Sequence, residues 1–200
     1  MSQLLIEPAR RTGCEDLPAL AEILREATQR QRSPIDDVLD AEVVDEEKYL
    51  RELANDLGLE WLDNIPMPEV PLPLREACGP RIALRHRLLP VAIEGEGLHK
   101  RLKLATFDPF NLVARQAAAQ EIELPVDWCM ASRRRIHEAL RRLYGVGADT
   151  FEQILEGRDF DYDNLADGED EANVIDNDDD EEASVVKFVN QIIREALDQR

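Results

Sequence analysis

Residues able to catalyse a reaction or bind a metal are sparse in this 200-residue sequence. None of its histidines and cysteines has a second Cys or His at the short spacing of a metal site. These residues are His86, His99, His137, Cys14, Cys78 and Cys129. The sequence also lacks the G-x-x-x-x-G-K-[ST] loop that binds nucleotide phosphates and the G-x-S-x-G turn of serine hydrolases. We therefore predict no catalytic residue, no metal site and no bound cofactor.

An acidic stretch toward the C-terminal end approaches the pattern of a calcium-binding loop. Its oxygens fall on the first, third, fifth, ninth and twelfth places, at Asp159, Asp161, Asp163, Asp167 and Asp170. However, Asn164 stands where that loop needs Gly, and Asp170 replaces the bidentate Glu. We interpret the stretch as a solvated acidic linker without a specific metal site, open to weak and nonspecific binding of divalent cations.

Basic side chains are concentrated in one segment, which holds Arg133, Arg134, Arg135, Arg141 and Arg142. Two interpretations are open. The arginines can form a solvated helix face, or they can bind an acidic partner or the chain's own acidic tract. Within this cluster the candidate docking residues are Arg133, Arg134 and Arg141.

The composition describes a soluble core with an acidic appendage. Hydrophobic residues make up 44% of the chain, which is enough for a core, while charged residues make up 34% and the net charge is -19. From Asp149 to Glu182 the only basic residue is Arg158, so most of the negative charge lies in this tract. Phosphate binding needs a surplus of Lys and Arg, so the composition argues against a nucleic-acid partner.

Features that would place the chain outside the cytoplasm are missing from the sequence. No run approaches the roughly 18 apolar residues of a membrane span, and the start MSQLLIEPARR has no apolar signal segment. The odd number of widely spaced cysteines suits reduced thiols. We expect a cytoplasmic protein without direct membrane insertion.

The N-terminal part is predicted to form three short helices over residues 15–58. The first runs from Leu17 to Thr28 after an N-cap at Asp16, the second covers residues 35–38, and the third begins at Asp45 and ends at Gly58. The first helix has an apolar stripe that includes Leu17, Leu20, Ile23 and Leu24. This stripe can dock into a partner's groove, or it can pack on the third helix of its own lobe.

The middle of the chain is predicted to be a compact α/β sandwich. Four prolines between Asn64 and Pro73 indicate a linker. Strands are then expected at residues 88–93, 101–106 and 123–130, with helices at residues 111–121 and 132–145, in the order β-β-α-β-α. The buried side of the first of these helices is expected to hold Leu112, Val113, Ala117 and Ala118.

The sequence thus predicts an α+β chain with five parts. They are an N-terminal helical lobe (1–63), a Pro-rich linker (64–79), the sandwich (80–147), an acidic flexible linker (148–182) and a C-terminal helix (183–200). The last helix has a broad apolar stripe at Val185, Val189, Ile192, Ile193, Ala196 and Leu197, so it needs a partner.

Four segments in this order resemble the N-terminal region of GspE/PilB-type secretion and pilus ATPases. Residues 45–50 with 57–59 are similar to that family's EE-x-L-x-x-A-L-A-x-x-LGL-P element, and residues 104–109 with Asn111 to its A-x-x-DP-x-N element. Residues 133–145 resemble its closing helix. Residues 183–190 resemble the APVV-K-x-VN helix that opens the ATPase portion.

The resemblance covers about residues 30–200 and leaves residues 1–29 without a family motif. It implies the non-catalytic docking and regulatory domain of a hexameric cytoplasmic motor for type II secretion or type IV pilus assembly. Such a domain makes protein–protein contacts with its own ATPase domain and with the cytoplasmic domain of a GspL/PilM-like inner-membrane platform protein. The full-length protein would bind ATP, whereas this chain is not expected to hydrolyse it.

The same resemblance offers cyclic di-GMP sensing as an alternative function. Relatives that bind this nucleotide have an Arg-Leu-Gly start and a later Gly. Here the corresponding stretches read Arg32-Ser33-Pro34 and Asp40-Ala41-Glu42, so acids stand near the position of a dianionic ligand. Docking is therefore the leading hypothesis, and sensing is the second.

Overall fold

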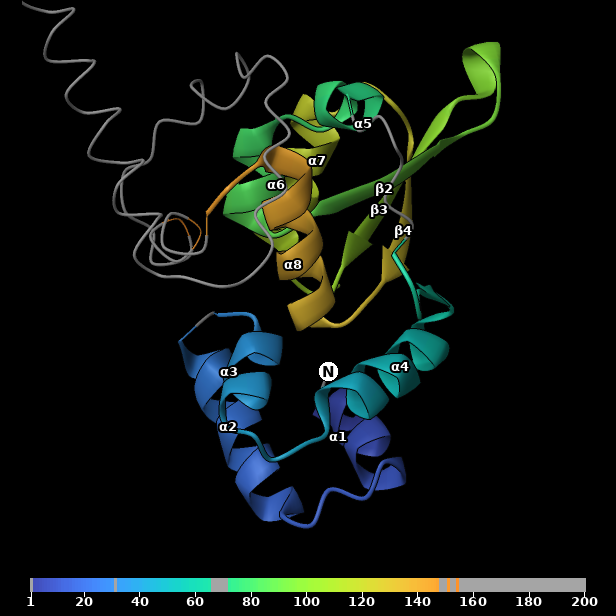
Figure 1. Ribbon diagram of the computed structural model, residues 1–200. Helices are drawn as coiled ribbons and strands as arrows, with labels where there is room; N and C mark the ends of the chain where they lie inside the picture. The colour runs from blue at the N-terminus through green and yellow to red at the C-terminus, as the bar shows by residue number, and fades with distance from the viewer. Residues whose placement is uncertain (1, 31, 66–71, 148–150, 152–153, 155–200) are drawn as a thin grey trace, which may run out of the picture. The chain divides into compact units, whose positions relative to one another are not determined.

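The fold is described from a computed structural model, in which residues 2–30, 32–65 and 72–147 are described together with Phe151 and Ile154 (Figure 1). All of them belong to one compact unit, which spans residues 1–167. This unit has a helical lobe followed by a four-stranded sheet covered by helices. The α+β fold class predicted from the sequence is confirmed.

The helical lobe contains α1 (Ser2–Arg11), α2 (Leu17–Gln29), α3 (Pro34–Asp40) and α4 (Glu46–Leu57). The predicted caps are present. Asp16 accepts a hydrogen bond from the Ala19 amide at 2.8 Å, and Asp45 accepts one from the Lys48 amide at 3.0 Å. Gly58 ends α4 with a φ of 65°, a left-handed conformation that glycine adopts without a steric cost.

Helix α1 corrects the prediction of a three-helix lobe. Leu5 and Ala9 are buried, so the helix contributes to the core, and Arg11 forms ion pairs with Glu52 and Asp56 of α4 at 2.9 and 2.7 Å. The helix was missed because its start carries no N-cap or acidic first turn and because Pro8 lies inside it.

The sheet has the strand order β1-β4-β3-β2, built from β1 (Glu60–Trp61), β2 (Leu89–Glu94), β3 (Arg101–Thr106) and β4 (Val126–Met130). Strands β2 and β3 form the predicted antiparallel hairpin, while β4 is parallel to both β3 and β1. A Cβ at Gly95, in the hairpin turn, would lie 2.4 Å from the His99 carbonyl oxygen, so this position requires glycine.

Strand β1 shows that the predicted boundary at residue 63 is wrong. Glu60 and Trp61 pair in register with Cys129 and Met130 of β4, and this makes β1 part of the sheet rather than of the helical lobe. A strand of two residues is too short to give the alternating pattern by which strands are predicted.

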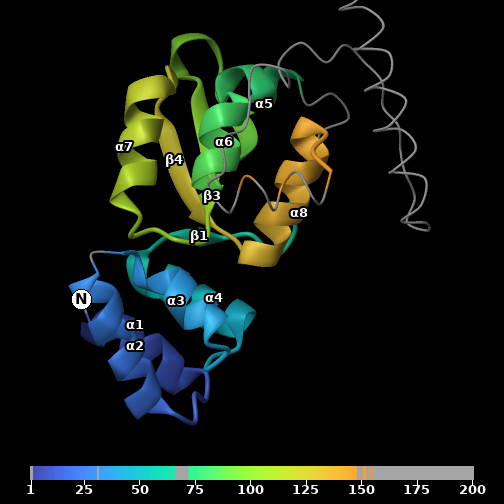
Figure 2. The ribbon, with the colours of Figure 1, turned by 90° about the vertical axis from the view of Figure 1, so that its left-hand side faces the viewer.

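Four helices accompany the sheet: α5 (Leu72–Ala77), α6 (Pro80–His86), α7 (Leu112–Glu121) and α8 (Arg133–Tyr144). Helices α6, α7 and α8 lie on one face of the sheet (Figures 1 and 2). The predicted stripe of α8 is buried as expected, at Ile136, Leu140, Leu143 and Tyr144. Helix α5 corrects the predicted linker over 64–79, because Pro73 lies in the first turn, where its missing amide costs nothing.

The buried side of α7 differs from the prediction. Leu112 and Val113 are 76% and 68% exposed, whereas Ala114 and Ala118 are buried. Ala117 is half-buried. The two buried alanines are four residues apart and so share one face of the helix, which turns the first two apolar residues outward.

The predicted acidic linker and C-terminal helix lie outside the described residues, apart from Phe151 and Ile154, which are both buried. Among the helices that the structure describes, none has the length and apolar character needed to cross a bilayer.

Candidate functional site

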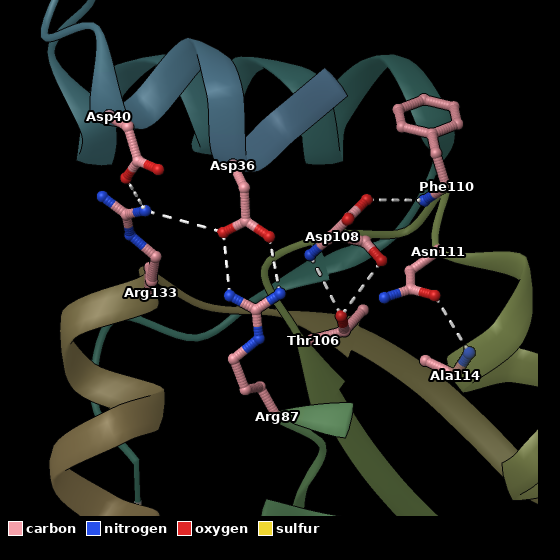
Figure 3. A network of polar contacts seen from close by, with 9 residues as sticks. All are labelled: Asp36, Asp40, Arg87, Thr106, Asp108, Phe110, Asn111, Ala114 and Arg133. Atoms are coloured by element: carbon pink, nitrogen blue, oxygen red, sulfur yellow. Dashed lines mark hydrogen bonds and ion pairs between the residues drawn. The ribbon is translucent and has the colours of Figure 1, made fainter. Parts of the chain in front are cut away.

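The turn from β3 into α7 is closed by polar side chains that are buried in the domain. Thr106 Oγ1 accepts a hydrogen bond from the Asp108 amide at 3.0 Å and donates one to the Asp108 carbonyl oxygen at 3.2 Å. Asp108 Oδ1 accepts from the Phe110 amide at 3.1 Å, and Asn111 caps α7 by accepting from the Ala114 amide at 3.0 Å (Figure 3). The A-x-x-DP-x-N motif is therefore the sequence of a rigid turn.

Asp108 is only 4% exposed. Burial raises its pKa, while Ser33, the Phe110 amide and Arg87 oppose that rise. Ser33 Oγ and Asp108 Oδ2 are both buried, and neither has a well-aligned hydrogen-bond partner among the described residues. Burial is therefore the main cause of the raised pKa of Asp108.

Beside this turn, Asp36 of α3 forms a two-hydrogen-bond ion pair with Arg87, which follows α6. The two donor–acceptor distances are 2.8 and 2.5 Å (Figure 3). Both side chains are about a quarter exposed, and the residues are 51 positions apart in the sequence. The pair therefore joins the helical lobe to the sheet domain.

The first turn of α8 faces further acids of the helical lobe. Arg133 pairs with Asp40 and lies 3.5 Å from Asp36, and Arg135 donates to Glu47 at 3.0 Å. The Arg134 backbone amide donates to Glu46 at 3.3 Å, at a helix N-terminus where a carboxylate is favoured. We call Asp36, Asp40, Glu46 and Glu47 with Arg87, Arg133 and Arg135 the lobe interface.

Aromatic rings of the sheet domain pack next to the lobe interface. The Arg87 guanidinium lies 4.8 Å from the centre of the Phe107 ring. His137 packs edge-on against Phe107 and Phe151, with ring centres 5.9 and 5.3 Å apart. Burial, with Arg87 and Arg133 nearby, lowers the pKa of His137 to about 4, so the imidazole is neutral at neutral pH.

Part of this chain matches a known domain family. A family model for the MshEN domain matches residues 57–150. Residues 57–150 form an MshEN domain. The match confirms the resemblance to the N-terminal region of GspE/PilB-type ATPases, and it begins just before β1, where the sheet begins.

The fold of this chain is similar to that of one solved structure in particular. The structure of MshE with cdg is 20% identical in sequence, with a TM-score of 0.54 over 70% of this chain and 98% of that chain. The N-terminal domain of XpsE is 24% identical over 60% of this chain and 93% of that chain, but its TM-score of 0.40 is too low to add an argument. No curated protein matches the chain.

The apolar docking candidates lie in the helical lobe, before the MshEN domain. Leu20 and Leu24 are 0% and 2% exposed, which corrects their prediction as surface anchors: α2 packs them against its own lobe. Leu17 and Ile23 are half-buried and keep part of their surface available.

The basic docking candidates divide between the lobe interface and the surface. Arg133 is only 22% exposed and is paired within the chain, so it is not free to bind a partner. Arg134 and Arg141 are exposed, and within the described ranges neither guanidinium has an ion pair. They are seven positions apart, so they share one face of α8.

Sequence reasoning missed Asp36 and Arg87, the central pair of the lobe interface. No local pattern marks a contact over 51 positions, so only the fold could reveal it. In the part of the chain that the structure describes, no group of three His, Cys, Asp or Glu side chains could hold a metal ion. A shallow depression of about 150 Å³ lies beside α8, lined by Asp63, Asn64, Ile65, Arg135, Glu138, Ala139 and Arg142, and mixes both charges.

Proposed function

We propose that this chain is the docking and regulatory N-terminal module of a type II secretion or type IV pilus motor ATPase. The observation that carries the proposal is the MshEN match over residues 57–150. In this proposal the chain tethers a hexameric cytoplasmic motor to the inner membrane through the cytoplasmic domain of a platform protein. The ATPase domain of the same protein performs the hydrolysis.

The exposed face of α8 is the surface that we assign to docking. Arg134 and Arg141 point away from the core stripe of this helix, and neither is neutralised by a described acid. Two guanidinium groups on one helix, with no ion pair to any residue that the structure describes, suit bidentate contacts with carboxylates. The partner surface is therefore expected to be acidic, and Leu17 and Ile23 of α2 are secondary candidates.

The proposal is tested with the whole chain and the purified cytoplasmic domain of a GspL- or PilM-like protein. Reversing both charges, with Arg134→Glu and Arg141→Glu, should weaken binding by about tenfold or more, roughly 1.4 kcal/mol, because attraction becomes repulsion. The melting temperature should not change, since both side chains are exposed.

A matched control reverses the same amount of charge elsewhere, with Arg10→Glu and Lys100→Glu, and should bind like the unmodified chain. Equal loss in both variants would show that only net charge matters. If the unmodified chain binds no platform domain, the docking function itself is wrong.

Cyclic di-GMP sensing is the second candidate, and the fold shared with MshE, which was solved with cdg, favours it. Two features of this chain oppose it. Glu42 has a φ of 54° at the position where relatives that bind the nucleotide have Gly. The acids Asp36 and Asp40 of the same segment already neutralise Arg87 and Arg133, so these guanidinium groups are not available to phosphates. Docking is therefore the function that we propose.

A further inference from the structure

Five side chains form a continuous series of contacts from the helical lobe to the segment that follows α8. Asp36 pairs with Arg87, Arg87 lies over Phe107, and His137 packs edge-on between Phe107 and Phe151. They come from α3, the end of α6, the turn after β3, α8 and the chain beyond α8. We call this series the relay.

Arg87 is the point at which the relay is under strain. Its φ of 54° is in the left-handed region, which is sterically unfavourable for a residue with a Cβ. It ends α6 there, with its own amide bonded to the Ala83 carbonyl oxygen. The side chain is held at its tip by Asp36 and along its plane by Phe107. Loss of Asp36 therefore removes a contact that fixes a strained residue.

The far end of the relay is anchored by burial. Phe151 is 3% exposed, its ring contacts His137, and its amide donates to the Gly147 carbonyl oxygen at 3.0 Å. Ile154, three positions further along the chain, is also buried. These two residues fix the point from which the chain continues toward its acidic tract.

We propose that the relay couples the position of α3 to the anchoring of Phe151. When α3 is displaced, Arg87 loses its partner, the Phe107 and His137 rings repack, and Phe151 is held less tightly. A role for this coupling in a motor ATPase rests on the proposed docking function. The coupling itself is a property of the chain alone, so its test needs no platform partner.

The test is hydrogen exchange of the Phe151 amide in the whole chain. Asp36→Asn should accelerate this exchange about fivefold or more, because local opening becomes easier. The amide of Val146, which bonds to the Arg141 carbonyl oxygen at 2.9 Å outside the relay, should keep its rate. Asp127→Asn is the matched control, since it removes the same charge from a two-hydrogen-bond arginine pair on the sheet, and it should change neither amide.

A second variant distinguishes the relay from general loosening. His137→Leu interrupts the ring contacts and should itself accelerate Phe151 exchange, after which Asp36→Asn should add no further change at Phe151. Equal acceleration of Val146 and Phe151 by Asp36→Asn, an unchanged Phe151 rate, or additive effects of the two substitutions would each overturn the coupling.

Discussion

Two arginine–aspartate pairs of this protein each have two hydrogen bonds of similar length, but they lie in different surroundings. Arg87 and Asp36 are joined by hydrogen bonds of 2.8 and 2.5 Å, and Arg101 and Asp127 by bonds of 2.6 and 2.5 Å. The side chains of the first pair are 22% and 26% exposed, those of the second 48% and 46%. Bond length alone would rank the two pairs as equal.

The two ion pairs differ in what surrounds them. Arg101 and Asp127 belong to neighbouring strands that the backbone ladder of β3 and β4 already holds in register, so their ion pair fixes little that is not fixed. Asp36 and Arg87 join two parts of the chain, and Arg133 and the Phe107 ring complete their environment. An ion pair matters most where water is excluded and where the backbone does not already hold its partners.

Removing each acid in turn tests whether the two ion pairs contribute differently to stability. Asp36→Ala leaves Arg87 and Arg133 half-buried without their shared carboxylate, so we expect a loss of about 2 to 4 kcal/mol in the free energy of unfolding. Asp127→Ala should change stability by no more than the error of a urea titration, because the exposed Arg101 guanidinium that remains is hydrated by water. Urea unfolding of the three proteins measures both effects, and equal losses would contradict the distinction.

Acid should destabilise the fold through His137, by about 3 kcal/mol at pH 4. The pKa of His137 is about 4 in the folded chain and about 6.5 when unfolded. Between these values only the unfolded chain binds the proton, so stability should fall as the pH falls from about 6.5 to about 4. His137→Leu should flatten this part of the pH profile. His86, whose pKa is also lowered by burial, is present in both proteins and cancels in the comparison.

Helices α2 and α7 show how much the sequence could predict. Both helices were predicted from local signals, α2 from the spacing of its apolar residues and the N-cap at Asp16, and α7 from the spacing of its apolar residues. The predicted buried face of α7 was right at Ala118 and wrong at Leu112 and Val113, because apolar residues occur around most of this Ala-rich helix and tertiary packing selects the stripe through Ala114. The interface of Asp36 with Arg87 depends on how distant segments meet, which no spacing rule encodes.

The smallest expected effect is a difference in salt dependence between the two pairs. Raising the salt concentration from about 0.1 M to about 1 M shortens the Debye length from about 10 Å to about 3 Å, which screens exposed charges much more than buried ones. Any stability difference between the unmodified chain and Asp127→Ala should therefore vanish in high salt. Most of the difference caused by Asp36→Ala should persist, because its partners are shielded from solvent ions. Urea titrations of the three proteins at both salt concentrations measure this, and comparing each variant with the unmodified chain under the same salt removes the general effect of salt on unfolding. If the Asp36→Ala difference also collapses, water and ions reach the lobe interface freely, and its two hydrogen bonds are worth no more than those of the pair on the open sheet.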